Sequence, residues 1–273
     1  MIEDFFRYDF LTRALLAGIM LGVLAPVIGQ FLVVRRFSLL ADTLSHVSLL
    51  GVALAVFFGF PIFVGALGAS LIGGIGMEQI RRSGKVMSES ILALFLSGSL
   101  ALALVFLAIS QGVGFHLLSY LFGSISTVTS LDLKILGVLT VITLLFLING
   151  YRKLFLISLD EDLARTSGVA VTIYNIFFIV LASAVVAGSI GIVGALLIGA
   201  LMIIPIVAAM QWKLSFFMTL VMGVLFAELS VLIGYFTAYY LDLPSGATIV
   251  LIALGVFLFS YVFHFAWHPK KGT

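Results

Sequence analysis

The chain alternates between long apolar stretches and short clusters of polar and charged residues. Six long windows contain no Asp, Glu, Lys or Arg: 14–34, 43–77, 90–131, 135–151, 166–212 and 243–269. A segment needs about 20 mostly apolar residues to cross roughly 30 Å of hydrocarbon, so several of these windows can hold two crossings. Because the runs are continuously apolar instead of alternating, they predict membrane-spanning helices and not barrel strands.

Glycine, proline and charged residues divide these windows into nine expected helices. They are placed near 14–34, 40–58, 61–80, 90–110, 132–150, 171–188, 191–210, 216–240 and 247–266. The expected fold is therefore an all-α, polytopic transmembrane bundle of nine spans, forming a single domain over residues 1–273. Gly188, Gly191 and Gly194 could instead mark a broken helix or a re-entrant segment, and the count would then be eight or ten.

The composition agrees with this class and excludes others. Hydrophobic residues make up 63% of the chain and charged residues 10%, whereas a soluble domain carries about 25% charged residues. A soluble enzyme and a nucleic-acid-binding protein are thereby excluded. With no cysteine, neither disulfides nor thiolate metal ligands are available. The phosphate-binding pattern G-x-x-x-x-G-K-[ST] is absent, so the chain is not expected to hydrolyse ATP itself.

The positions of Lys and Arg predict an orientation. If the amino terminus lies outside, eleven of the fourteen Lys and Arg residues fall on the inner side, and Arg7, Arg13 and Lys134 lie outside. An excess of positive charge on the cytoplasmic side is the usual rule. The amino terminus is therefore expected outside and the carboxyl terminus inside, and the net charge of +2 needs no polyanionic partner.

Asp42 and His46 stand out because both lie in an expected span. At a spacing of four residues they share one face of a helix. If the helix is continuous from Arg36, His46 lies about 15 Å from it, close to the bilayer centre. An ionisable pair at that depth is costly unless it faces a cavity or has a function.

Three roles are open for this pair from the spacing alone. A carboxylate and an imidazole are ligands that suit a divalent cation such as Zn²⁺, and two copies of the chain would supply two nitrogens and two oxygens. Alternatively, Asp42 accepts a hydrogen bond from His46 or from a neighbouring helix and binds nothing. The pair could also relay protons.

Two further residues are weaker candidates for a metal pathway. Glu228 lies in the eighth expected span, where pairing with Ser230 or another helix is the favoured interpretation. His116 lies in the outer segment 111–131, where an interfacial histidine is favoured over one that meets arriving metal.

Residues 151–170 form the largest expected inner segment. Within it, 158–168 has the pattern of a short amphipathic helix, with Ser158 as cap, acidic residues in the first turn and Gly168 at the end. Both a coupling element that contacts a partner and a solvated loop helix fit this pattern.

Several stretches together resemble the membrane permease subunits of bacterial zinc and manganese ABC importers. They are RRFSLLADTLSHVSLLGVA from residue 35, YLFGSI from residue 120, DEDLA from residue 160 with Gly168, GALLIGALMIIP from residue 194 and LPSGATIV from residue 243. The DTLSH and YLFG sequences look more like the zinc-uptake members. Manganese members more often carry Pro where Leu50 stands.

This resemblance implies a permease homodimer in the bacterial cytoplasmic (inner) membrane, which moves divalent metal, Zn²⁺ or alternatively Mn²⁺ or iron, into the cell. It also implies two cytoplasmic subunits that bind ATP and an extracytoplasmic metal-binding protein, with no permanently bound cofactor. It assigns Asp42 and His46 to the metal pathway and places the coupling to the ATPase in 151–170, at Asp160, Glu161, Ala164 and Gly168. A proton-coupled secondary transporter remains the alternative from another class.

Overall fold

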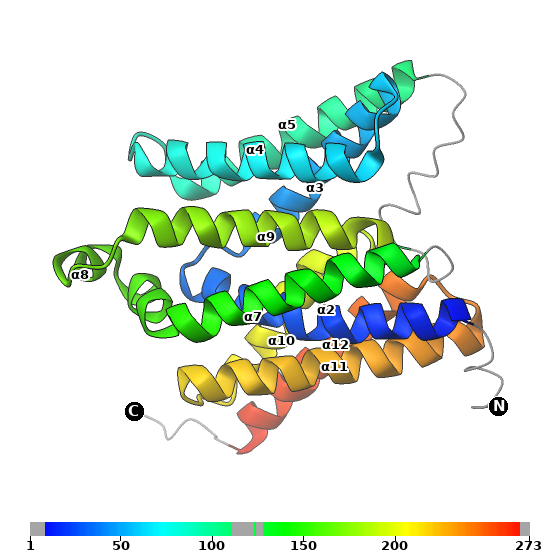
Figure 1. Cartoon of the computed structure of the whole chain (residues 1–273). Coiled ribbons are helices and arrows are strands. Elements are labelled where there is room, and N and C mark those ends of the chain that lie inside the picture. Colours follow the sequence, from blue (N-terminus) through cyan, green and yellow to red (C-terminus); the bar gives the residue numbers. More distant parts are fainter. Residues whose placement is uncertain (1–8, 111–122, 124–127, 268–273) are drawn as a thin grey trace.

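The computed structural model describes residues 9–110, 123 and 128–267, and within 9–110 and 128–267 the chain folds into successive helices (Figure 1). The helices are α2 (Asp9–Val34), α3 (Leu39–Phe58), α4 (Ile62–Arg82), α5 (Ser88–Ile109), α7 (Ser130–Leu159), α8 (Glu161–Thr166), α9 (Val171–Val193), α10 (Ala195–Met210), α11 (Phe216–Leu241) and α12 (Ser245–Trp267). The all-α prediction is confirmed.

The nine expected long helices are all present, but one of them is too short to be a full span. Eight helices in the described ranges are long and apolar enough to cross a membrane, and α10 has only 16 residues. At 1.5 Å per residue α10 is about 24 Å long, less than the hydrocarbon thickness. The break before α10 falls at Gly194, whose φ of 83° and ψ of 161° are open essentially to glycine alone. Of Gly188, Gly191 and Gly194, it is therefore Gly194 that ends one helix and separates it from the next.

Helix α7 is longer than the apolar pattern predicts. It continues from the expected end near residue 150 through Arg152 and Lys153 to Leu159. At 30 residues it is about 45 Å long, so its last turns extend beyond the hydrocarbon. The ammonium group of Lys153 lies 5.3 Å from the ring centre of Tyr174 on α9, a cation–π contact that supports this polar extension.

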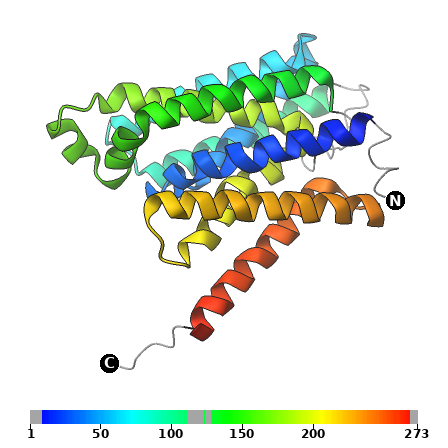
Figure 2. The ribbon, with the colours of Figure 1, turned by 60° about the horizontal axis from the view of Figure 1, so that its bottom comes forward.

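Helix α2 lies at the centre of the bundle and packs against α7, α9, α10 and α11. Helices α4 and α5 pack on α3 at one edge of the molecule, and α12, which packs on α10 and α11, leans away from the bundle (Figure 2). The apolar sides of α5, α7, α11 and α12 are mostly exposed in the single chain. Such surfaces suit contact with lipid or with another membrane-embedded chain.

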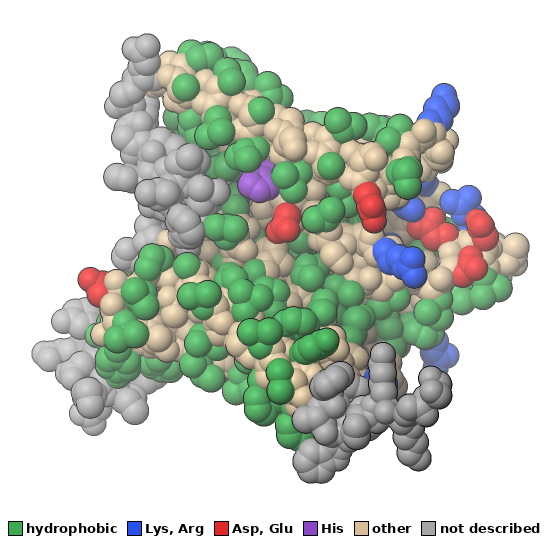
Figure 3. Space-filling view, turned by 180° about the vertical axis from the view of Figure 1, so that it is seen from behind, with side chains coloured by type: hydrophobic (Ala, Val, Ile, Leu, Met, Phe, Trp, Pro, Cys, Tyr) green, Lys and Arg blue, Asp and Glu red, His purple; other side chains and the backbone are tan. Residues whose placement is uncertain are grey.

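The two ends of the bundle differ in charge. Hydrophobic side chains cover most of the face in Figure 3, whereas Lys, Arg, Asp and Glu gather mainly at the end where α8 lies. Helix α12 runs toward this same end and α2 begins at the opposite one (Figure 1). That the α8 end is cytoplasmic remains a prediction from the distribution of positive charge.

Helices α3 and α4 cross with almost no space between their backbones. Gly65 of α4 lies against the backbone of Gly51 on α3, so a methyl group on either residue would meet the other's carbonyl oxygen. Gly68, one turn further along α4, has nothing within 4 Å of the position its β-carbon would take. The crossing therefore depends on glycine at position 65 and not at position 68.

We expect Gly65→Ala to destabilise the protein and Gly68→Ala to leave it unchanged or slightly stabilised. Both substitutions gain the same helix propensity, but only the first overpacks a crossing, at a cost of about 1–3 kcal/mol. Thermal unfolding of the detergent-purified variants measures the difference. Equal melting temperatures would contradict the tight crossing.

Candidate functional site

Asp42 and His46 lie on α3, which begins at Leu39. The helix is not continuous from Arg36, because residues 35–38 form a turn in which Arg36 has a φ of 56°. His46 is therefore seven residues from the helix start at Leu39, about 10 Å along the axis, and the expected helical rise of about 15 Å from Arg36 does not apply. Asp42 is in the first turn, where the helix dipole favours a carboxylate.

Asp42 is half-buried and opens into a groove between α3, α10 and α12. One wall of the groove is formed by Gly199 of α10, against which the Asp42 carboxylate packs so closely that a β-carbon at 199 would meet Oδ1. The groove has a volume of about 580 Å³. Apart from Asp42 and Ser38 its lining is apolar: Leu39, Leu196, Gly199, Ala200, Ile203, Ile204, Ala247, Val250 and Leu251.

His46 is also half-buried, and its Nδ1 atom has no hydrogen-bond partner among the described residues. The interpretation in which Asp42 accepts a hydrogen bond from His46 therefore does not hold for the Nδ1 atom. A buried polar atom without a partner is uncommon and calls for an explanation. In the tautomer that leaves Nδ1 unprotonated, its lone pair can bind a cation or a proton.

Glu228, the other metal candidate within the described residues, does not join this pair. Glu228 lies on α11 and packs against Gly22 of α2, with Oε1 buried and unpaired in the described part of the chain. The Ser230 hydroxyl, expected as a partner for Glu228, donates instead to the carbonyl of Phe226. His116 lies outside the described residues. Across the described ranges, no three His, Cys, Asp or Glu side chains come together where they could hold a metal ion.

The predicted coupling residues form the short helix α8 and its ends. Asp160 is the N-cap, with Oδ1 accepting hydrogen bonds from the backbone nitrogens of Asp162 at 2.8 Å and Leu163 at 3.0 Å. Ala164 is fully buried, and Gly168 follows the helix with a φ of 80°. The prediction that Ser158 caps this helix is wrong, because α7 continues through Ser158.

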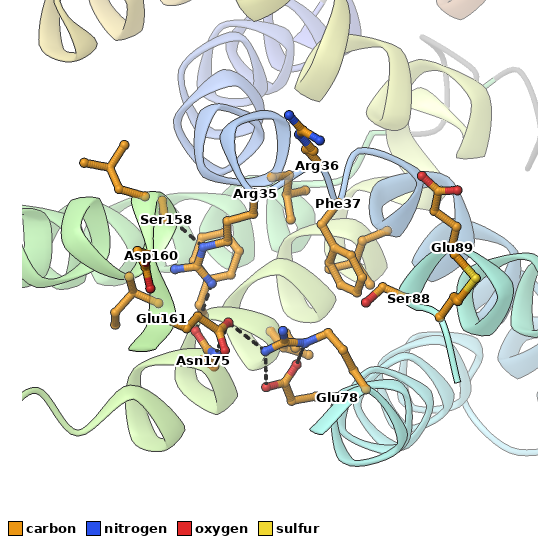
Figure 4. Close-up of a pocket in the computed structure, with 18 residues that line it drawn as sticks. Arg35, Arg36, Phe37, Glu78, Ser88, Glu89, Ser158, Asp160, Glu161 and Asn175 are labelled. Atoms are coloured by element: carbon orange, nitrogen blue, oxygen red, sulfur yellow. Dashed lines mark hydrogen bonds and ion pairs between the residues drawn. The ribbon is translucent and has the colours of Figure 1, made fainter. Parts of the chain in front are cut away.

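Glu161 of α8 connects the helix to the rest of the protein. Its Oε1 accepts hydrogen bonds from Arg81 Nη2 on α4 at 2.9 Å and from Asn175 Nδ2 on α9 at 3.0 Å. Arg81 also forms a bidentate pair with Glu78, at 2.7 and 2.9 Å. Arg35, in the turn before α3, donates to Asn175 Oδ1 at 2.9 Å (Figure 4).

Arg35 occupies the inner part of this network. Its Nε donates to the Ser158 hydroxyl at 3.0 Å, and its guanidinium lies 5.0 Å from the ring centre of Phe178. Burial lowers the pKa of Arg35 to about 10, although the nearby Glu161 carboxylate raises it. The guanidinium thus stays charged at neutral pH. Arg36 points away from the network (Figure 4).

The network borders a cavity of about 420 Å³ at the α8 end of the bundle.

Sequence reasoning missed Arg35, Glu78, Arg81 and Asn175 as functional candidates. A signal was present for two of them, because Asn175 interrupts a charge-free apolar window and Glu78 ends another. Asn175 and Glu78 are only 2% and 1% exposed, so their polar groups depend on partners within the protein.

Comparison of the whole chain with known proteins identifies its family. Residues 7–264 match the family model described as the ABC 3 transport family. The chain belongs to the ABC 3 transport family. As a member it is a multi-pass membrane permease, in agreement with its apolar helices.

Named relatives of this ABC 3 family chain cover nearly its whole length. A protein of Treponema pallidum named as a probable metal transport system membrane protein is 34% identical over 92% of this chain and 94% of its own. The manganese import system permease protein ScaB of Streptococcus gordonii is 32% identical, covering 96% of this chain and 95% of the relative.

Solved structures share the ABC 3 chain's fold. The structure described as PsaBC from Streptococcus pneumoniae in complex with Fab superposes with a TM-score of 0.83 at 29% identity, covering 96% of this chain and 95% of that one. A metal-chelate type ABC transporter in an inward-facing conformation gives a TM-score of 0.76 over 93% of this chain and 86% of its own. At 22% identity, this second likeness supports the fold alone.

Proposed function

We propose that this protein is the permease subunit of an ATP-driven importer that moves a divalent transition-metal cation across the bacterial cytoplasmic membrane. The observation that carries the proposal is the half-buried Asp42–His46 pair on α3, with an unpaired imidazole nitrogen and a carboxylate that opens into an apolar groove. Isolated ionisable groups are expensive in such surroundings unless they meet a cargo. Family membership and the names of the relatives support metal as that cargo.

Each chain supplies one carboxylate and one imidazole, which is too few donors for a complete coordination shell. We propose that two copies of the permease face each other across α3, so that both pairs act on one ion. Two imidazole nitrogens and two carboxylate oxygens approach the tetrahedral set that zinc prefers. An incomplete or transient shell also favours release, which a pathway needs.

Transport in this proposal is driven from the α8 end. Separate cytoplasmic subunits bind ATP, dock on α8 through the surface around Asp160 and Gly168, and displace the helix as they close. The permease dimer then opens alternately to the two sides. An extracytoplasmic metal-binding protein delivers the ion to the outer side.

The cargo has two candidates. The carboxylate and imidazole donors and the DTLSH sequence favour zinc. The named relatives favour manganese, because ScaB of Streptococcus gordonii and MntC of Listeria monocytogenes are both named for manganese, and a Haemophilus influenzae relative is named for iron.

The function is tested by reconstituting the permease in liposomes with and without its ATP-binding subunit, with the extracytoplasmic metal-binding protein added on the outer side. We expect metal uptake only with both subunits and ATP, and competition between radioactive Zn²⁺ and excess Mn²⁺ or Fe²⁺ identifies the cargo. Uptake driven by a proton gradient without the ATP-binding subunit would contradict the proposal and support a secondary transporter. ATP-dependent uptake of none of the three metals would contradict the assignment of cargo.

A further inference from the structure

The side chain of Asn175 joins two parts of the molecule that act at different steps of the proposed transport cycle. Its amide nitrogen donates to Glu161 on α8, and its amide oxygen accepts from Arg35, in the turn that leads into α3. Asn175 is only 2% exposed, so water does not readily replace either partner. The amide is thus a direct bridge between α8 and the start of the helix that carries Asp42 and His46.

Arg35 holds this turn from more than one side. Besides its bond to Asn175, it donates to Ser158 near the end of α7 and lies over the ring of Phe178 on α9. A guanidinium held by hydrogen bonds to two residues and by a ring face has little freedom to rotate. Arg35 thus ties Asn175, Ser158 and Phe178 to the α2–α3 turn.

One donor in this network is unused. The Nη2 atom of Arg35 is buried and has no hydrogen-bond partner among the described residues, although the Glu161 carboxylate lies just beyond the Asn175 amide. Arg35 therefore has a donor free to take a further acceptor if α8 is displaced. Buried, charge-assisted hydrogen bonds are either formed or broken, so the side chains that make them adopt a few distinct arrangements. This is expected of an element that switches between two states.

We propose that Arg35 and Asn175 are positioning residues that couple displacement of α8 to the metal-bearing helix α3. This inference rests on the proposed function, since it assumes that ATP-binding subunits act on α8. Arg81 and Glu78 anchor the other side of Glu161 to α4, so α8 moves with the inner ends of α4 and α9 and with the turn before α3.

The test compares metal uptake and ATP hydrolysis by the same reconstituted complex. Asn175→Leu keeps the size of the side chain and removes both hydrogen bonds. We expect it to assemble with the ATP-binding subunit and to hydrolyse ATP, but to import roughly tenfold less metal per ATP, within the range expected for broken coupling elements. The control is Asn149→Leu, the same substitution at an exposed residue of α7 whose amide donates to the Leu145 carbonyl within its own helix.

An exchange of chemical groups separates coupling from folding. Asn175→Asp alone should uncouple the complex, because two carboxylates would then face each other. The double variant Asn175→Asp/Glu161→Gln restores one amide and one carboxylate across the contact and should recover much of the metal imported per ATP. A purely structural role predicts no such recovery, provided that thermal stability and assembly are the same in the single and double variants.

The outcomes distinguish this inference from the function on which it rests. If the unmodified complex shows no ATP-driven uptake, the proposed function fails. If the unmodified complex imports metal and Asn175→Leu imports as much per ATP, only the coupling role fails. Loss of assembly or stability in Asn175→Leu, together with no recovery in the double variant, would likewise overturn the coupling role.

Discussion

His46→Ala and Asp42→Asn are each expected to abolish ATP-driven metal uptake while leaving assembly with the ATP-binding subunit intact. Loss of groups that only orient a metal ligand already costs 10–100-fold, so loss of a direct ligand should cost more than about a hundredfold. Both side chains are half-buried on one face of α3, and within the described part of the chain His46 Nδ1 forms no hydrogen bond that the substitution would remove. The variants should therefore fold and bind their partners.

Ser48→Ala is the matched control for these variants. Ser48 lies on the same helix, fully buried, and its hydroxyl has no partner among the described residues. Its removal should leave uptake unchanged. Initial rates of uptake in proteoliposomes, with pull-down of the ATP-binding subunit, measure both properties. Normal uptake by His46→Ala and Asp42→Asn would exclude the pair from the pathway.

The same variants separate a metal pathway from a proton relay. A relay predicts that uptake depends on an imposed pH gradient and that His46→Ala loses this dependence. A metal pathway predicts instead that uptake saturates with metal concentration and that the variants lose metal protection against thermal unfolding. The two roles thus leave different signatures in one set of proteins.

The bundle could be predicted from sequence because hydropathy alone decides which segments enter lipid. Charge-free windows, divided at glycine and proline, placed the ends of the long helices to within five residues, except where a helix continued outside the hydrocarbon. Residues 151–159 of α7 are such a case, because Arg152 and Lys153 end the apolar run without ending the helix. Helical hydrogen bonding continues in water, so a hydropathy pattern marks the span and not the helix.

The site was only partly predictable, for a different reason. Asp42 and His46 are four residues apart, and helix geometry places them on one face without any knowledge of the fold. Gly199 and Asn175 are far from Asp42 and Arg35 in sequence, and only tertiary packing brings them together. The turn before α3 depends on the positive φ of Arg36, which no local pattern of side chains indicates.

Gly199→Ala is expected to reduce metal uptake by at least about tenfold without loss of stability. A β-carbon at this position would occupy the space of Asp42 Oδ1, so the carboxylate must rotate away from its place beside α10. A displacement of about 1 Å in a functional group can cost up to a hundredfold in rate. Alanine is also the better helix former, so α10 itself should not be weakened.

Gly255→Ala on α12 provides the control, because nothing lies within 4 Å of its β-carbon position. If Gly199 acts only by placing Asp42, the double variant Gly199→Ala/Asp42→Asn should be no worse than Asp42→Asn alone. Additive losses would instead show that Gly199 serves the packing of α10 independently. Uptake at full rate by Gly199→Ala would mean that the position of the Asp42 carboxylate beside α10 is not the one used in transport. The break at Gly194 matters for the same reason, since it sets the course of α10 and so brings Gly199 against Asp42, the acidic side chain that lines this groove.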